Sequence, residues 1–121
     1  MTWILVVDDD VDVNETMRMI LEMSCHPTAG ALNGKEALTI IEKADTSPNL
    51  IFLDLWMPVM DGITFLEHRK KDLKLKQIPT YLVSADAEIE KVCKRGDATG
   101  FLSKPVCLDD LMRVANKYTK H

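Results

Sequence analysis

The chain of 121 residues is long enough for one domain with a single buried core, and its length excludes two ordinary domains. Hydrophobic residues make up 46% and charged residues 28%, a balance that excludes an intrinsically disordered chain. The net charge of −4 provides no basic surface, so we expect no direct binding of nucleic acid. We therefore expect one domain over residues 1–121.

The sequence also predicts where the chain works in the cell. No apolar run approaches the length of a membrane span, and the N-terminus lacks the order of a signal peptide. Cys25, Cys93 and Cys107 form no CxxC pair and are expected to be free thiols, as in a reducing compartment. We therefore expect a cytoplasmic protein that does not contact a membrane.

In chain order, the first expected strand is the apolar run 3–7, which three aspartates follow. Asp12 is then expected to cap a helix. The apolar stripe of this helix consists of Val13, Met17, Ile20 and Leu21. The weak segment 25–29 is expected to be a strand at the edge of the sheet, because Pro27 is tolerated only there.

The middle of the chain repeats this order. Asn33 with Glu36 resembles a capping box and predicts the next helix. The apolar run 50–53 predicts a buried strand and ends in an aspartate. Asp61 is then expected to cap a helix that carries Ile63, Phe65 and Leu66.

The last third of the chain predicts two further strands, 80–83 and 99–103. Asp86 is expected to cap the helix between them, and Gly96 to end that helix at a C′-type position, which is usually left-handed. A final helix is expected to carry on one face Leu108, Leu111, Met112, Ala115 and Tyr118. Strands that alternate with helices in this way predict an α/β fold, a parallel sheet with helices on both faces.

Polar residues follow the expected strands at their carboxyl ends. They are Asp8 and Asp9, then Asp54, Ser84 and Lys104. In an open parallel sheet, ligands bind outside these strand ends, so we expect the side chains to converge in one shallow pocket. Singly, such residues often only cap a helix or end a turn; their common placement is what indicates a site.

The charges of this pocket indicate its chemistry. Two carboxylates about 4 Å apart repel each other by roughly 4 kcal/mol at an effective dielectric constant of 20, so three need cations. Lys104 supplies one, and a hard divalent ion such as Mg²⁺ suits the others. Carboxylates serve as phosphoryl acceptors, and Ser84 and Lys104 are expected to hold the phosphoryl oxygens.

Four segments that contain these residues match a known family. They are Val-Val-Asp-Asp-Asp at 6–10, Leu-Asp-Leu-Trp-Met-Pro-Val-Met-Asp-Gly at 53–62, Ser-Ala at 84–85 and Lys-Pro at 104–105. Over nearly its full length the chain resembles the receiver domains of two-component response regulators. The resemblance implies a flavodoxin-like (βα)5 fold, with five parallel strands in the order 2-1-3-4-5.

The resemblance also implies roles for single residues. Asp54 would take a phosphoryl group from a phosphohistidine, and Ser84 and Lys104 would contact that group. Asp9 and Asp54 would bind Mg²⁺, or Mn²⁺ in its place, with the backbone carbonyl of Trp56, whereas Asp8 would act mainly through water. The chain would be a signalling phosphoacceptor that catalyses its own phosphoryl transfer and hydrolysis rather than an enzyme acting on a separate substrate.

The implied partners are a sensor histidine kinase or a phosphotransfer protein. After phosphorylation, Ser84 would move inward and the switch aromatic, Phe101, would follow it. The surface of the family's fourth helix, fifth strand and fifth helix would then change its output partner. The resemblance leaves open whether the chain is a monomer or a phosphorylation-dependent dimer. It also implies a cis Lys104–Pro105 peptide bond, as in the family.

Trp56 and Asp86 are expected to modulate this site. Trp56 is bulky for a position beside the acceptor, and we hypothesise that its ring shields the acyl phosphate from water. Asp86, two residues after Ser84, is interpreted first as a helix cap and second as a contact for the attacking water. His26, His68 and His121 lack the spacing of metal ligands, so no histidine metal site is expected.

The sequence also bears on three other functions. An aspartyl-phosphate phosphohydrolase of the haloacid dehalogenase type needs an acid where Trp56 stands. A flavodoxin-like cofactor binder needs a phosphate loop where the three aspartates at 8–10 stand, and these would repel an anionic cofactor. A receiver used only as an unphosphorylated binding module stays open, although the intact acidic set argues against it.

Overall fold

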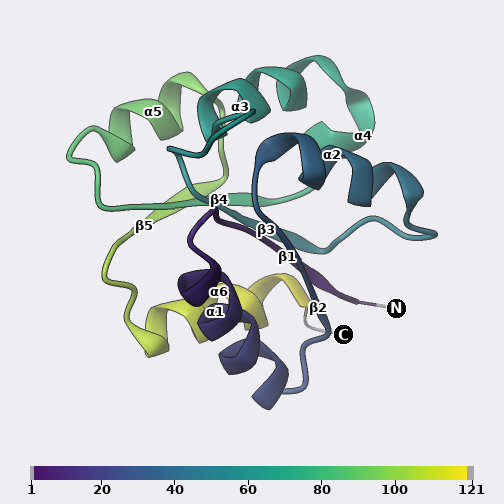
Figure 1. Ribbon diagram of the computed structural model, residues 1–121, viewed down its shortest axis with the longest axis vertical. Helices are drawn as coiled ribbons and strands as arrows, with labels where there is room; N and C mark the ends of the chain where they lie inside the picture. Colours follow the sequence, from purple (N-terminus) through teal and green to yellow (C-terminus); the bar gives the residue numbers. More distant parts are fainter. Residues whose placement is uncertain (1, 120–121) are drawn as a thin grey trace.

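One parallel sheet organises the chain in the computed structural model, which describes residues 2–119 (Figure 1). Its strands run in the order β2-β1-β3-β4-β5, and all four neighbouring pairs are parallel. Their bounds are β1 Ile4–Val7, β2 Thr28–Ala31, β3 Leu50–Leu53, β4 Thr80–Ser84 and β5 Gly100–Ser103. The predicted α/β fold and its strand order are confirmed.

Helices cover both faces of this sheet. Figure 1 shows α1 and α6 on one face and α2, α3, α4 and α5 on the other. Their bounds are α1 Val11–Met23, α2 Gly34–Lys43, α3 Gly62–Lys71, α4 Leu73–Lys76, α5 Ile89–Arg95 and α6 Leu108–Thr119. The short α4, which Asp72 caps, was not predicted. The helices that the family counts as fourth and fifth are therefore α5 and α6.

The core consists of two apolar clusters, one on each face of the sheet. Leu5 and Val7 of β1 belong to the cluster beneath α2, α3 and α5. Ile4 and Val6 belong to the cluster beneath α1 and α6. All four side chains are at most 1% exposed, as expected for a strand that is covered on both faces.

The edge strand is where the sequence signal was weakest. β2 occupies the predicted edge but spans Thr28–Ala31 rather than 25–29. Cys25 still belongs to the turn after α1 and has a φ of 68°. Pro27 precedes the strand, and its carbonyl oxygen accepts a 2.9 Å hydrogen bond from the Ile4 N–H. The proline ring thus stays outside the ladder, where it costs no hydrogen bond.

The predicted helix caps have a mixed outcome. Asn33 accepts from the Glu36 N–H at 2.9 Å and Asp61 from the Thr64 N–H at 2.8 Å, so both are confirmed. The prediction for Asp12 was wrong. Asp10, in an extended conformation, caps α1, and Asp12 lies in the first turn, where a carboxylate favours the helix dipole.

The ends of α5 also differ from the prediction. The helix begins at Ile89, after the expected cap Asp86, whose carboxylate instead accepts from the Glu88 N–H. Gly96 ends the helix with an ordinary φ of −83°, and Asp97 takes the left-handed conformation with a φ of 58°. Gly96 packs so tightly on Leu66 that a Cβ would lie 2.5 Å from Leu66 Cδ1, so close packing explains this glycine.

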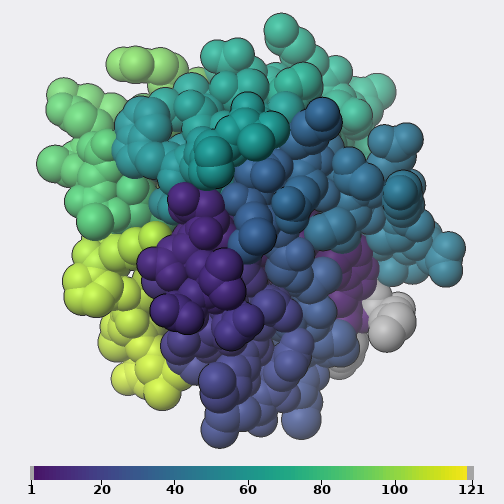
Figure 2. Space-filling model, viewed as in Figure 1, coloured from purple at the N-terminus to yellow at the C-terminus, as the bar shows by residue number. Residues whose placement is uncertain are grey.

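Segments far apart in sequence meet around the N-terminal helix. Figure 2 shows the purple N-terminal segment beside the yellow-green segment that follows β5. Between them runs an apolar groove of about 570 Å³, lined from α1 and from the loop before α6.

No helix within the described residues is long and apolar enough to cross a membrane.

Candidate functional site

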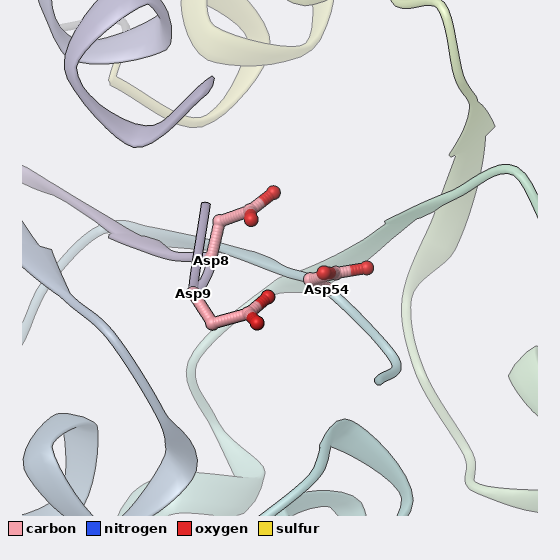
Figure 3. Close-up of side chains that lie close together, drawn as sticks. All are labelled: Asp8, Asp9 and Asp54. Carbon is pink, nitrogen blue, oxygen red and sulfur yellow. The ribbon is translucent and has the colours of Figure 1, made fainter. Parts of the chain in front are cut away.

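Three carboxylates meet at the carboxyl ends of β1 and β3. A ligand oxygen from each of Asp8, Asp9 and Asp54 can be chosen so that all three lie within 4.8 Å of one another. Figure 3 shows the three side chains close together. Asp8 and Asp54 are buried, 2% and 8% exposed, whereas Asp9 is exposed. The structure thus brings together the acidic residues that the sequence predicted.

The ladder of the sheet places these residues. β1 and β3 are parallel neighbours, with Val7 opposite Leu53, so their next residues emerge side by side. The Asp54 N–H donates to the Val7 carbonyl at 2.9 Å, and the Asp8 N–H donates to the Ala31 carbonyl at 3.0 Å. The backbone of both carboxylates is therefore fixed by hydrogen bonds that continue the sheet beyond its last paired residues.

Lys104 reaches the cluster from the loop after β5. Its Nζ lies 2.9 Å from Asp8 Oδ2 and 3.7 Å from Asp54 Oδ2. Its own N–H donates to the Ser84 carbonyl at 2.9 Å, and the following peptide bond to Pro105 is cis. Lys104 thus bridges two of the three carboxylates, as its position after a strand predicted.

The balance of charge shifts the pKa of two groups. Burial raises the pKa of Asp54 to about 6, and the Asp8 carboxylate adds to this rise while Lys104 opposes it. Burial disfavours the charged form of Lys104, but contacts with Asp8 and Asp54 outweigh it and raise the lysine pKa. With all three carboxylates ionised against one ammonium, two negative charges remain in excess. That excess, on oxygen donors alone, fits a hard divalent cation.

Ser84 ends β4, is 3% exposed and lies at the same edge of the sheet. Its Oγ accepts a 3.1 Å hydrogen bond from the Asp86 N–H. Within residues 2–119, no hydrogen bond joins Ser84 to Asp54. The hydroxyl is therefore placed near the carboxylates but held by the loop that follows its own strand.

Trp56 and Asp86 form a contact that the sequence did not predict. Trp56 Nε1 donates to Asp86 Oδ2 at 2.8 Å, which joins the loops after β3 and β4. The pKa of Asp86 is lowered by the hydrogen bond from the Glu88 N–H and then by that from Trp56. The signal was present: the two residues stand two positions after Asp54 and Ser84, at the ends of neighbouring parallel strands.

Other predicted positions lie apart from the carboxylates. Phe101 is half-buried on β5 and packs against the apolar cluster beneath α5. His26 faces Asn116 and Thr119 on α6, and neither His26 nor His68 belongs to the acidic cluster of the described chain. His121 lies outside the described residues.

Asn14 is a residue of this region that sequence reasoning missed. It is 2% exposed, and its amide contacts backbone carbonyls next to Asp8. Its spacing from Met17 and Leu21 was the available signal, because all three belong to the buried stripe of α1. A polar residue on such a stripe needs partners, and the strand ends provide them.

Comparison with known proteins agrees with this geometry. The family model described as the response regulator receiver domain matches residues 4–116. An uncharacterised 14.6 kDa protein of Leptolyngbya boryana is 33% identical, covering 95% of this chain and 88% of its own. The two-component response regulator ORR3 of Oryza sativa subsp. indica is 30% identical, covering 94% and 88%.

Solved structures share the architecture. The chemotaxis protein CheY4 of Vibrio cholerae superposes with a TM-score of 0.86 at 27% identity, covering 98% of both chains. The receiver domain of NtrX from Brucella abortus gives a TM-score of 0.83 at 34% identity, covering 95% of this chain and 96% of its own. Both comparisons extend over nearly the whole sheet and its helices.

Proposed function

Because this chain belongs to the response regulator receiver domain family of two-component systems, we propose that Asp54 is its phosphoryl acceptor. Receiver domains are signalling domains that interact with histidine kinases or phosphotransfer proteins. The donor proposed here is a phosphohistidine of such a partner. One observation carries the proposal: Asp54 is the buried carboxylate at which an acid cluster and a lysine converge.

The transfer uses groups that the site already positions. A carboxylate oxygen of Asp54 attacks phosphorus and forms a P–O bond, the P–N bond to the histidine breaks, and the imidazole nitrogen takes up a proton. Lys104 Nζ, 3.7 Å from Asp54 Oδ2, is placed to stabilise negative charge on the phosphoryl oxygens. Ser84 Oγ is the second group proposed to hold that phosphoryl group.

The oxygen donors fit Mg²⁺, with Mn²⁺ as the alternative, so we assign the metal to Asp9, Asp54 and the backbone carbonyl of Trp56. Asp8 is assigned a role mainly through water. Both of its oxygens are already engaged, Oδ1 by the Asp10 N–H at 2.9 Å and Oδ2 by Lys104 at 2.9 Å. When bound, the metal would offset the excess negative charge of the carboxylates and the incoming phosphoryl group.

A switch is proposed for Ser84 and Phe101. Ser84 Oγ accepts only from the Asp86 N–H within the described chain, so the hydroxyl is free to donate to a phosphoryl oxygen. Phe101 would follow into the space that Ser84 leaves. The surface of α5, β5 and α6 would then change its output partner. The cytoplasmic location stays a prediction, as does a monomer or a phosphorylation-dependent dimer.

Trp56 and Asp86 are proposed to set the lifetime of the acyl phosphate. Trp56 is 53% exposed, and its hydrogen bond to Asp86 holds the indole between two loops of the site. A ring held there would hinder the approach of water. We expect Trp56→Asn to dephosphorylate faster than the wild type after excess donor is removed; equal rates would refute the shielding role.

Intact-protein mass after incubation with acetyl phosphate tests the proposal. We expect a Mg²⁺-dependent gain of one phosphoryl group in the wild type and none in Asp54→Asn. No gain in a folded wild-type sample would favour a receiver that works as an unphosphorylated binding module.

A further inference from the structure

A buried asparagine ties the first helix to the strand ends that carry the acidic cluster. Asn14 of α1 is 2% exposed. Its Nδ2 donates to the carbonyl oxygens of Asp8 at 3.0 Å and Ala31 at 2.9 Å, with that of Val6 at 3.4 Å. One side-chain amide thus serves the ends of both β1 and β2.

The orientation of this amide follows from its other neighbour. Arg18 Nε lies 2.8 Å from Asn14 Oδ1. A guanidinium has donors and no acceptor, so the oxygen of the amide must face Arg18. The two N–H bonds of Nδ2 are therefore both directed at the backbone carbonyls.

The Asp8 carbonyl depends on this contact. The Asp8 N–H continues the ladder to β2 by donating to Ala31. Its carbonyl lies past the last paired residue of β1, and within residues 2–119 its hydrogen-bond partner is Asn14. The asparagine therefore takes the place of the next rung of the sheet, at the peptide that joins Asp8 to Asp9.

We propose that Asn14 is a positioning residue of the phosphoacceptor site. It fixes the peptide between Asp8 and Asp9, so that both carboxylates already face Asp54 before a cation binds. The inference rests on the proposed function of this cluster as a Mg²⁺-dependent site. Groups that orient metal ligands typically change metal affinity by about 10–100-fold when they are removed.

Gly30 offers independent support from the neighbouring strand. A Cβ at Gly30 would lie 2.5 Å from Asn14 Oδ1 and 2.7 Å from Arg18 Nε. The pair of side chains occupies the surface of β2 at this residue, which explains a glycine inside a strand. Gly30→Ala would displace the amide without deleting it.

The test is the Mg²⁺ affinity, read from Trp56 fluorescence in a Trp3→Phe background, because Trp3 and Trp56 are the two tryptophans. We expect Asn14→Ala to bind Mg²⁺ about tenfold more weakly. The matched control is Asn49→Ala. Asn49 also bonds the backbone, accepting from the Trp3 N–H at 3.3 Å and donating to Tyr118, but it precedes β3 at the opposite edge. The control should lose stability and keep its Mg²⁺ affinity.

An unchanged Mg²⁺ affinity in folded Asn14→Ala would overturn the positioning role and leave the proposed function intact. Absence of a Mg²⁺ response in the wild type would instead contradict the proposed function, and the positioning role with it.

If Asn14→Ala does not fold, the Mg²⁺ affinity of Gly30→Ala tests the positioning role instead. We expect Gly30→Ala to bind Mg²⁺ about threefold more weakly than Gly100→Ala, which lies on the opposite edge strand, β5, and whose Cβ would meet the Tyr81 ring. Equal affinities would overturn the inference.

Discussion

The two edges of the sheet treat buried charge in opposite ways. At the carboxyl edge, Asp8 and Asp54 share one lysine, and burial, together with repulsion from Asp8, raises the pKa of Asp54. At the amino edge, buried Arg69 of α3 donates to carbonyl oxygens of Lys76, Ile78 and Asp97 at 2.7–3.3 Å. The positive charge at the amino edge is therefore hydrogen-bonded, whereas negative charge is in excess at the carboxyl edge.

The amino edge therefore contributes to stability, whereas the carboxyl edge provides the functional site. Arg69 joins α3 to the segments that lead into β4 and β5, because its guanidinium donates to the carbonyl oxygens of Ile78 and Asp97. The ionised Asp54 carboxylate lowers stability in the absence of a metal ion, since it is buried and lies beside the Asp8 carboxylate. A folded protein retains such a cluster at a site where function requires it.

The largest expected effect is a loss of stability at the amino edge of the sheet, where Arg69 lies. Arg69→Met should lower the free energy of unfolding by about 3 kcal/mol, because the carbonyls of Ile78 and Asp97 lose a charged donor. Urea denaturation measures this loss. The folded variant should still accept a phosphoryl group, since the arginine lies at the edge opposite Asp54; loss of phosphorylation in a folded sample would contradict the separation.

The second effect is a gain in stability, in the variant Asp54→Asn, and it depends on pH. The pKa of Asp54 is about 6 in the folded protein and roughly 3.9 in an unfolded chain. The folded state therefore holds this proton more tightly, and wild-type stability falls as pH rises from about 4 to 6. Asp54→Asn should be more stable by roughly 2–3 kcal/mol above that range in metal-free buffer and equal to the wild type below it.

Unfolding curves of both proteins at several pH values check this expectation. The gain in Asp54→Asn should shrink when Mg²⁺ is added, because a bound cation stabilises the folded wild type by mass action. A wild type more stable than Asp54→Asn at pH 7 without metal would contradict the account of the carboxyl edge.

The smallest expected effect tests whether Asp61, an acidic residue close in sequence to Asp54, belongs to the metal site. Asp61 caps α3 through the Thr64 N–H at 2.8 Å and is absent from the acidic cluster. Asp61→Ala should cost about 1 kcal/mol of stability and leave the Mg²⁺ affinity unchanged. A weaker Mg²⁺ affinity would assign Asp61 to the site.

Much of this structure could be predicted from sequence, for identifiable reasons. Continuous apolar runs at 4–7 and 50–53 identify strands that are buried on both faces, and the residues after them must meet at one edge. That logic placed Asp8, Asp54 and Lys104 together. It failed at Pro27 and Cys25, where a turn and a short edge strand leave no apolar pattern.

The contacts that the sequence did not predict are made by side chains with the backbone or across two loops. Asn14 lies on a buried helical stripe, but its partners are carbonyls of two strands that only the folded sheet brings together. Trp56 and Asp86 meet because neighbouring strands share a register. Arg69 stands in a basic run, after His68 and before Lys70 and Lys71, so only burial distinguishes it from a surface charge.

The most direct test of the central claim locates the phosphoryl group itself. Wild-type protein and Arg69→Met, phosphorylated with acetyl phosphate and Mg²⁺, are treated with borohydride, which reduces an acyl phosphate of aspartate to homoserine. Peptide mass mapping should find homoserine at position 54 alone in both proteins. Homoserine at another aspartate, or none in the folded wild type, would contradict the assignment of phosphoryl chemistry to Asp54.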